Sequence, residues 1–292
     1  MNNFLNNIKY EFKQGTILNK LIYINGGVFL LASMLNVLSF LFQYNFNPLL
    51  NKFYLPSNIN ILIRQPWSFV SYMFLHNDFL HFLFNMIYLH FGGKLFLKHL
   101  NQKQLLGTYI LGGLIGGLLF IIAYNYAPVL LPFTDKTLAL GASASALAIV
   151  IAIATYIPNY NIQLPFIGSL KLKHVAIAII ILEILSLPKG NTGGHIAHIG
   201  GAIFGYLYIK QLKRRNDLSS SFINFIYKFI NSFKIKNTKK NQKRRAKSDH
   251  EFNSEKAKKQ KEIDKILEKI AKSGYESLNK EEKKNLFSAS KK

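Results

Sequence analysis

Two short apolar stretches of the chain combine small residues with a serine or a histidine that could take part in catalysis. Residues 138–149 read LALGASASALAI, with Ser143 among glycine and alanine in an apolar run, and residues 194–205 read GHIAHIGGAIFG, with His198. Small residues let two membrane helices approach closely, because no bulky side chain separates their backbones. A serine that faces a histidine across such a contact could form a nucleophile and its base. The serine could equally be a packing residue, which is common at membrane helix interfaces.

Ser143 and Ser145 cannot both serve as nucleophile, because residues two apart point to nearly opposite sides of a helix. Gly141, Ser145 and Ala148 fall at i, i+4 and i+7 and form a small-residue stripe suited to helix packing. We therefore predict that Ser145 packs and that Ser143 lies at the mouth of a cavity.

His195 and His198 are three residues apart, a spacing that could also bind a metal. Zinc proteolysis would need a nearby glutamate base and a third ligand, as in H-E-x-x-H, and neither is expected here. We therefore predict no metal and no cofactor. His198 shares a helical face with Gly201 and Gly205 and is the predicted base, whereas His195, a turn nearer to water, is a supporting or bystander residue.

His81 and Asn85 are four residues apart and so share one helical face. Both side chains can donate hydrogen bonds, and together with the backbone N–H of Ser143 they could stabilise an oxyanion. The alternative is that they form hydrogen bonds between helices that serve stability alone. No acid is placed to orient His198, since Glu183 is the only carboxylate within the apolar segments and receives no role, so a serine–histidine dyad is implied.

The charge of the chain is unevenly distributed. The net charge is +23, but residues 1–212 hold thirteen Lys and Arg against four acids, whereas residues 213–292 hold twenty-four against ten. This shift predicts a membrane part followed by a soluble basic tail. The chain has no cysteine, which excludes disulfides and thiolate chemistry.

The membrane part contains six apolar segments, which predict an all-α membrane protein with six transmembrane helices. They lie at residues 21–42, 79–96, 105–124, 138–157, 172–187 and 194–212. Lys and Arg gather in the loops on one side, which places both termini in the cytoplasm. The second, fourth and sixth spans then enter from the outer face, and His81, Asn85, Ser143 and His198 all lie roughly 3–10 Å below it, at 1.5 Å per residue. A transporter is disfavoured, because only one face carries polar residues at depth.

The tail has features of its own. Residues 221–236 place Phe222, Phe225 and Phe229 on one helical stripe, which predicts a helix at the membrane surface. Residues 239–247 are a basic cluster suited to anionic lipid. A hairpin of two short helices should follow, the second capped by Asn279 and Glu282. No nucleic-acid binding is expected, because a tail beside the membrane already explains the charge.

Over about residues 60–212 the motifs resemble, in order and spacing, those of rhomboid-family intramembrane serine proteases. These motifs are QPWSFVSYMFLH leading into HFLFN, then GASA, then AHIGGAIFG. The resemblance implies a rhomboid-like six-helix bundle whose water-filled cavity opens outward, with Ser143 as nucleophile, His198 as base, and His81 and Asn85 as oxyanion donors. It implies a serine endopeptidase that cleaves membrane-protein substrates with a single span, in or near the span.

Together with the charge and apolar patterns outside the matching region, this divides the whole chain. We predict a cytoplasmic amphipathic segment (1–20), the rhomboid-like protease domain (21–212), a basic juxtamembrane linker (213–250) and a cytoplasmic helical hairpin (251–292). The tail resembles those of some bacterial rhomboids, so the expected location is a bacterial plasma membrane.

Three departures from the family pattern leave a second hypothesis open. Ala144 stands where the family often has glycine, Leu147 stands where an aromatic partner of His198 is expected, and the long outer loop lacks a Trp-Arg pair seen in some members. The alternative is a catalytically silent rhomboid-like protein that binds membrane helices. Retention of both Ser143 and His198 favours the enzyme.

Overall fold

A computed structural model describes residues 12, 14–164, 168–233 and 249–290 of the chain. The chain divides into two compact units, Met1–Ser232 and Phe233–Lys292, which are described separately below. Most of the predicted amphipathic segment 1–20 and the whole basic cluster 239–247 lie outside the described residues.

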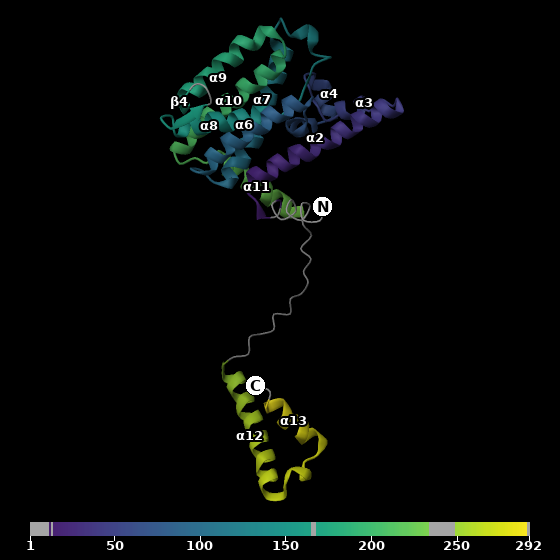
Figure 1. The fold of residues 1–292 in the computed structure, drawn as a ribbon, viewed down its shortest axis with the longest axis vertical. Coiled ribbons are helices and arrows are strands. Elements are labelled where there is room, and N and C mark those ends of the chain that lie inside the picture. Colours follow the sequence, from purple (N-terminus) through teal and green to yellow (C-terminus); the bar gives the residue numbers. More distant parts are fainter. Residues whose placement is uncertain (1–11, 13, 165–167, 234–248, 291–292) are drawn as a thin grey trace. The chain divides into compact units, whose positions relative to one another are not determined.

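The first unit is a helical bundle (Figure 1). Two of its described helices, α2 and α7, are long and apolar enough to cross a membrane by length and composition, and α8 is a shorter apolar helix. Six helices lie at the six predicted apolar segments: α2 (Ile17–Phe42), α6 (Phe79–Leu97), α7 (Gln102–Tyr126), α8 (Ser143–Tyr156), α9 (Leu172–Ser186) and α10 (Thr192–Lys213).

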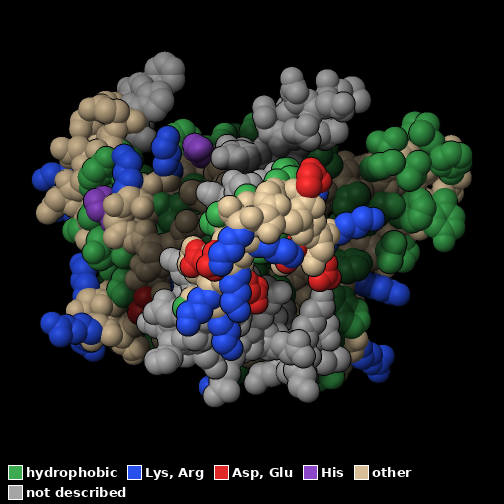
Figure 2. All heavy atoms as spheres, turned by 90° about the horizontal axis from the view of Figure 1, so that it is seen from below, with side chains coloured by type: hydrophobic (Ala, Val, Ile, Leu, Met, Phe, Trp, Pro, Cys, Tyr) green, Lys and Arg blue, Asp and Glu red, His purple; other side chains and the backbone are tan. Residues whose placement is uncertain are grey.

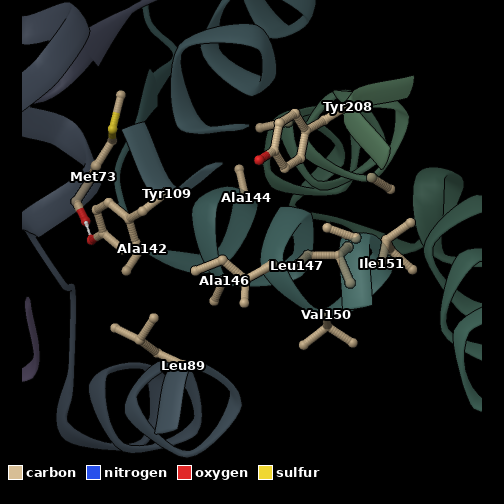
Figure 3. Packing of buried hydrophobic residues seen from close by; sticks show 14 of the residues in the cluster. Met73, Leu89, Tyr109, Ala142, Ala144, Ala146, Leu147, Val150, Ile151 and Tyr208 are labelled. Atoms are coloured by element: carbon tan, nitrogen blue, oxygen red, sulfur yellow. Dashed lines mark hydrogen bonds between the residues drawn. The ribbon is translucent and has the colours of Figure 1, made fainter. Parts of the chain in front are cut away.

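Helix α8 forms the centre of this bundle. Every residue from Ala144 to Ala154 is buried, and α6, α7 and α10 all pack against the helix. Figure 3 shows its side chains between Leu89 of α6 and Tyr208 of α10, with Tyr109 of α7 nearby. Because α8 is apolar all round, it must be enclosed by other elements.

Glycines bring the neighbouring helices into backbone contact with α8, as their spacing predicts. A Cβ added to Gly112 of α7 would overlap the side chain of Ala148, and one added to Gly116 would lie 2.8 Å from the Cβ of Ala144. A Cβ on Gly201 of α10 would overlap the backbone carbonyl of Ala144. No larger residue fits at these three positions without moving a helix.

The prediction that the fourth helix begins at residue 138 is wrong. Leu138–Ala139 is a strand, β2, which pairs antiparallel with β1 (Leu55–Pro56). Gly141 follows with φ of 128°, a conformation that favours glycine and stops the helix from extending backward. Helix α8 therefore begins at Ser143, and Gly141 is not part of its packing stripe.

The long connection between α2 and α6 is folded and supports this turn. It contains α3 (Asn47–Asn51), β1, α4 (Ile59–Arg64), α5 (Ser68–Ser71) and the 3₁₀ turn η1 (Tyr72–Phe74). The buried Tyr72 donates a 2.6 Å hydrogen bond to the carbonyl of Gly113 in α7, and its own carbonyl accepts a 2.9 Å bond from the N–H of Gly141. Tyr72 thus fixes the chain two residues before Ser143.

Three short elements complete the first unit before α11. The 3₁₀ turn η2 (Leu131–Phe133) lies between α7 and β2, and η3 (Leu187–Lys189) joins α9 to α10. Strands β3 (Asn161–Leu164) and β4 (Gly168–Lys171) pair antiparallel between α8 and α9. The β3–β4 hairpin thus leads from α8 into α9, and a connection of only a few residues leads from α9 to α10. Helix α9 packs against both α8 and α10.

Helix α11 (Leu218–Phe233) packs on the bundle through one face and exposes another. Ser219 is fully buried, whereas Phe225 and Phe229 are exposed. Asp217, just before the helix, accepts hydrogen bonds from the backbone of Ser220 and from the side chains of Gln104 and Tyr208. Burial raises the pKa of Asp217, but these hydrogen bonds outweigh it and hold the pKa below its usual range.

The second unit is a helical hairpin of α12 (Asp249–Ser273) and α13 (Lys280–Ser290), with the 3₁₀ turn η4 (Tyr275–Ser277) between them. The predicted cap of its second helix is confirmed. Asn279 accepts from the N–H of Glu282, whose carboxylate accepts from the N–H of Asn279, both at 2.8 Å.

The surface of the molecule reflects its basic composition. On the face shown in Figure 2, Lys and Arg side chains cover more area than Asp and Glu side chains, in keeping with the net charge of +23.

Candidate active site

The four predicted site residues line one cavity in the helical bundle. The cavity has a volume of about 940 Å³ and is bordered by side chains of α6, α8, α9 and α10. His81, Asn85, Ser143 and His198 all lie within the first two turns of their helices. The structure therefore brings together the residues that the sequence placed at one depth.

Ser143 is the first residue of α8, and its hydroxyl faces α10. The distance from Ser143 Oγ to His198 Nε2 is 2.6 Å, a short hydrogen bond. Ala142, the N-cap of α8, makes no side-chain hydrogen bond to the helix. The first N–H groups of a helix have no partner within it and carry partial positive charge. Negative charge that develops beside Ser143 would therefore be stabilised.

Ser145 points away from the cavity, as predicted for a packing residue. It is fully buried against α7, where a Cβ on Gly113 would lie 2.5 Å from its Oγ. Its hydroxyl has no hydrogen-bond partner, histidine included, among the described residues.

His81 is held at the start of α6 with its Nε2 beside the turn at Gly141. Asp78 caps the helix by accepting a 2.9 Å bond from the N–H of His81, and His81 Nδ1 accepts from the N–H of Asn77 at 3.5 Å. Nδ1 is then unprotonated, so Nε2 carries the hydrogen. A Cβ on Gly141 would lie 2.9 Å from His81 Nε2 and 3.4 Å from Ser143 Oγ, so the turn at Gly141 leaves this space open.

Asn85 lies one turn further along α6 and offers a second donor. Its side chain is 5% exposed and lines the cavity, and its amide nitrogen has no hydrogen-bond partner among the described residues. A buried donor without a partner costs about 1–3 kcal/mol. Asn85 therefore holds an unused donor at the wall of the cavity that Ser143 also lines.

Glu183 corrects the prediction that no acid orients His198. Its Oε2 lies 2.9 Å from Nδ1 of His198 and 2.6 Å from Nδ1 of His195. A carboxylate accepts, so each imidazole donates its Nδ1 hydrogen to it. The Nε2 of His198 then has a free lone pair facing the Ser143 hydroxyl, and His195 is attached to the same carboxylate.

The same three residues could also present ligand atoms to a metal, contrary to the expectation that no third ligand is near. The ligand atoms of Glu183, His195 and His198 all lie within 4.8 Å of one another. Two ligands on a tetrahedral zinc, with bonds of about 2.0–2.1 Å, stand about 3.3 Å apart. The separations of 2.6 and 2.9 Å from Glu183 are those of hydrogen bonds, so the geometry favours a shared carboxylate over a metal centre.

One signal in the sequence could have identified Glu183. It precedes the end of α9 by one turn, and the connection to α10 is only a few residues long, so it must lie at about the depth of His195 and His198. A carboxylate in an apolar helix is costly and generally has a partner. The rotation of α9 about its axis, which the sequence does not specify, decides whether it reaches them.

A family model covers the part of the chain that contains this cavity. The Rhomboid domain model matches residues 63–215, about half of the chain, from the end of α4 to just beyond α10. The chain belongs to the rhomboid family. Rhomboids are integral membrane proteins and generally serine intramembrane proteases.

Two curated relatives each match a little under half of the chain. The Presenilin-associated rhomboid-like protein A, mitochondrial, of Danio rerio is 31% identical over 140 residues, which is 47% of this chain and 35% of that protein. The RHOMBOID-like protein 12, mitochondrial, of Arabidopsis thaliana is 28% identical over 144 residues, 46% of this chain and 43% of that protein. The matches thus span less than half of the relatives' length. Residues 247–292 match a second model, a family of unknown function (DUF6576).

Proposed function

We propose that this rhomboid is an active intramembrane serine endopeptidase. The observation that carries the proposal is the 2.6 Å contact between Ser143 Oγ and His198 Nε2 at a cavity that two further donors border. A serine with an adjacent base is an activated nucleophile. Ser143 attacks the carbonyl of the scissile peptide bond, and its proton passes to His198, which then gives it to the leaving amine.

The oxyanion of the tetrahedral intermediate is stabilised by three donors. These are the backbone N–H of Ser143, Nε2–H of His81 and the side-chain amide of Asn85. Donors fixed in place before the reaction stabilise developing charge without reorganisation. The acyl-enzyme is then hydrolysed by a water molecule that His198 activates, which the cavity has room to admit.

The six helices α2 and α6–α10 are proposed to be six spans with both termini on the cytoplasmic side. Lys94, Lys98 and Lys103 lie around the connection of α6 to α7, on the side that would also hold the tail. The starts of α6, α8 and α10 then lie at the outer face, and so does the site. We propose the plasma membrane of a bacterium, on the resemblance of the tail, although the two curated relatives are mitochondrial by name.

The proposed substrates are membrane proteins with a single span. A peptide bond inside a helix has its carbonyl hydrogen-bonded and must leave the helix before Ser143 can attack it. Segments with poor helix-forming residues are therefore cleaved preferentially. The exposed aromatic face of α11 and the basic stretch beyond it are proposed to contact the bilayer and its anionic lipid.

The topology can be tested directly because the chain has no cysteine. Single cysteines at Lys136, after η2, and at Lys98, after α6, both replace exposed side chains. A membrane-impermeant maleimide added outside intact cells should label Lys136→Cys and not Lys98→Cys. The opposite pattern would reverse the orientation.

The enzyme is distinguished from a silent binding protein by a serine-directed fluorophosphonate. The purified full-length protein should form one covalent adduct, located at Ser143 by mass spectrometry. The variant Ser143→Ala should form none. A folded wild-type protein that is not labelled would support a silent rhomboid-like protein instead.

A further inference from the structure

The carboxylate of Glu183 is placed where the third member of a catalytic triad stands. It reaches His198 Nδ1 from the side opposite Ser143, with Oε2–Nδ1 and Nε2–Oγ distances of 2.9 and 2.6 Å. Its side chain is 17% exposed and that of His198 is 18% exposed, so both are largely shielded from bulk water. The three groups form a continuous line from α8 through α10 to α9.

We propose that Glu183 is a positioning residue that completes a Ser143–His198–Glu183 triad, an inference that rests on the proposed function. By accepting the Nδ1 hydrogen, the carboxylate holds His198 in the tautomer whose Nε2 lone pair faces Ser143. When the Ser143 proton moves to Nε2, the imidazolium keeps its Nδ1–H bond to Glu183. The carboxylate stays ionised, and the proton leaves with the amine of the cleaved peptide.

The surroundings of His198 explain why such a residue is needed. Leu147, which borders the same cavity, is aliphatic and offers no ring for the imidazole to stack on. The ring of His195 approaches edge-on, with centroids 5.9 Å apart and an interplanar angle of 87°, and is bonded to the same carboxylate oxygen. Among the described residues, Glu183 is the hydrogen-bond partner of His198 Nδ1, and this bond fixes the rotation of the ring.

His195 donates a second hydrogen bond to the same oxygen of Glu183, whereas the described partner of the Ser143 hydroxyl is His198. Its bond of 2.6 Å draws Glu183 toward the start of α10. Loss of His195 leaves the bond from Glu183 to His198 in place. The role of His195 is therefore to brace Glu183, and its removal should cost far less than the removal of Glu183.

The test measures turnover of a reconstituted single-span substrate and the rate of fluorophosphonate labelling in the full-length protein. Glu183→Gln keeps the shape of the side chain but can no longer select the tautomer as a carboxylate does. We expect kcat to fall about 10²–10³-fold with KM changed less than about threefold, and labelling to slow in parallel. Glu183→Asp should recover part of the lost rate. His195→Ala should lose about tenfold or less.

The matched control is Leu182→Ala, on the next residue of α9, whose side chain is 62% exposed and does not line the cavity. It should keep wild-type kcat within about twofold. Glu183→Ala is assayed beside the glutamine variant in case the latter fails to fold. Misfolding of every Glu183 variant would make the residue structural and overturn the triad.

The outcomes separate this inference from the proposed function. Wild-type turnover in folded Glu183→Gln would overturn the triad and leave the Ser143–His198 protease intact. A wild-type protein that neither cleaves nor is labelled would overturn both. Turnover that EDTA abolishes and zinc alone restores would assign Glu183, His195 and His198 to a metal site and overturn the triad.

Discussion

At the scale of single residues, His198 decides the chemistry because it is bonded on both ring nitrogens. Nε2 meets Ser143 and Nδ1 meets Glu183. The first contact was predictable from small residues that face one another in two apolar segments. The second was not, because the position of Glu183 around α9 depends on how α9 packs on α10, which no local pattern encodes.

Removal of His198 should have the same effect as removal of its partner. His198→Ala is expected to reduce kcat as far as Ser143→Ala does, and the double variant should be no worse, because members of one catalytic unit are not additive. Single-turnover cleavage measures this. If the double variant loses the product of the two single effects, the residues act independently and are not nucleophile and base.

Removal of the oxyanion donors should affect the transition state and not substrate binding. His81→Ala and Asn85→Ala are each expected to lower kcat on the order of 10²-fold, about 2.7 kcal/mol, with KM nearly unchanged. The pair should lose less than the product of the singles, because both donate to one oxygen. A raised KM at unchanged kcat would instead make that residue a substrate or packing contact.

At the scale of elements, the site depends on how closely α10 approaches α8. The positions of the helices along the chain can be predicted from the length of the apolar segments, and the close contact of α10 with α8 from the spacing of Gly201 and Gly205. The start of α8 does not, since the segment 138–142 is as apolar as the helix that follows it. There the pairing of β2 with β1 and the positive φ of Gly141 override the apolar pattern.

A larger side chain between α8 and α10 should destabilise the protein and misalign Ser143 with His198. In Gly201→Ala the new Cβ would overlap the carbonyl of Ala144, next to Ser143, so α10 must shift. We expect a loss of about 1–3 kcal/mol, visible as a lower Tm, and reduced turnover. Gly27→Ala in α2 is the matched control, because its Cβ meets nothing within 4 Å, and Ala favours the helix. An equal Tm for the two variants would contradict the close packing.

At the scale of the whole molecule, the chain joins a rhomboid bundle to a small helical unit that contributes no residue to the described cavity. Every residue of the site lies before Gly205. The helices of the tail could be predicted from its sequence better than the residue at which the tail leaves the bundle. The sequence predicts a linker from residue 213 onward, but Asp217 and Ser219 form hydrogen bonds with Gln104 and Thr108 of α7, which a pattern of charge and aromatic spacing does not reveal.

Two truncations separate the packed part of the tail from the rest. A chain ending at Ser232 keeps the Asp217 contacts and should retain turnover and stability in detergent. A chain ending at Leu212 loses the bonds that Asp217 accepts from Gln104 and Tyr208, and should unfold at a lower Tm. If the chain that ends at Ser232 folds but loses turnover, the helical unit of α12 and α13 must act on the site.

Ser143 is proposed to be the nucleophile of a protease, and a comparison of the two serines of α8 tests this. Wild type, Ser143→Ala and Ser145→Ala are reconstituted in liposomes with a single-span substrate, and the cleavage products are quantified. Ser143→Ala should yield no product above background while remaining folded. Ser145→Ala, which alters only packing against Gly113, should keep most of the turnover. Equal loss of turnover in both folded variants, or cleavage by Ser143→Ala, would contradict the account.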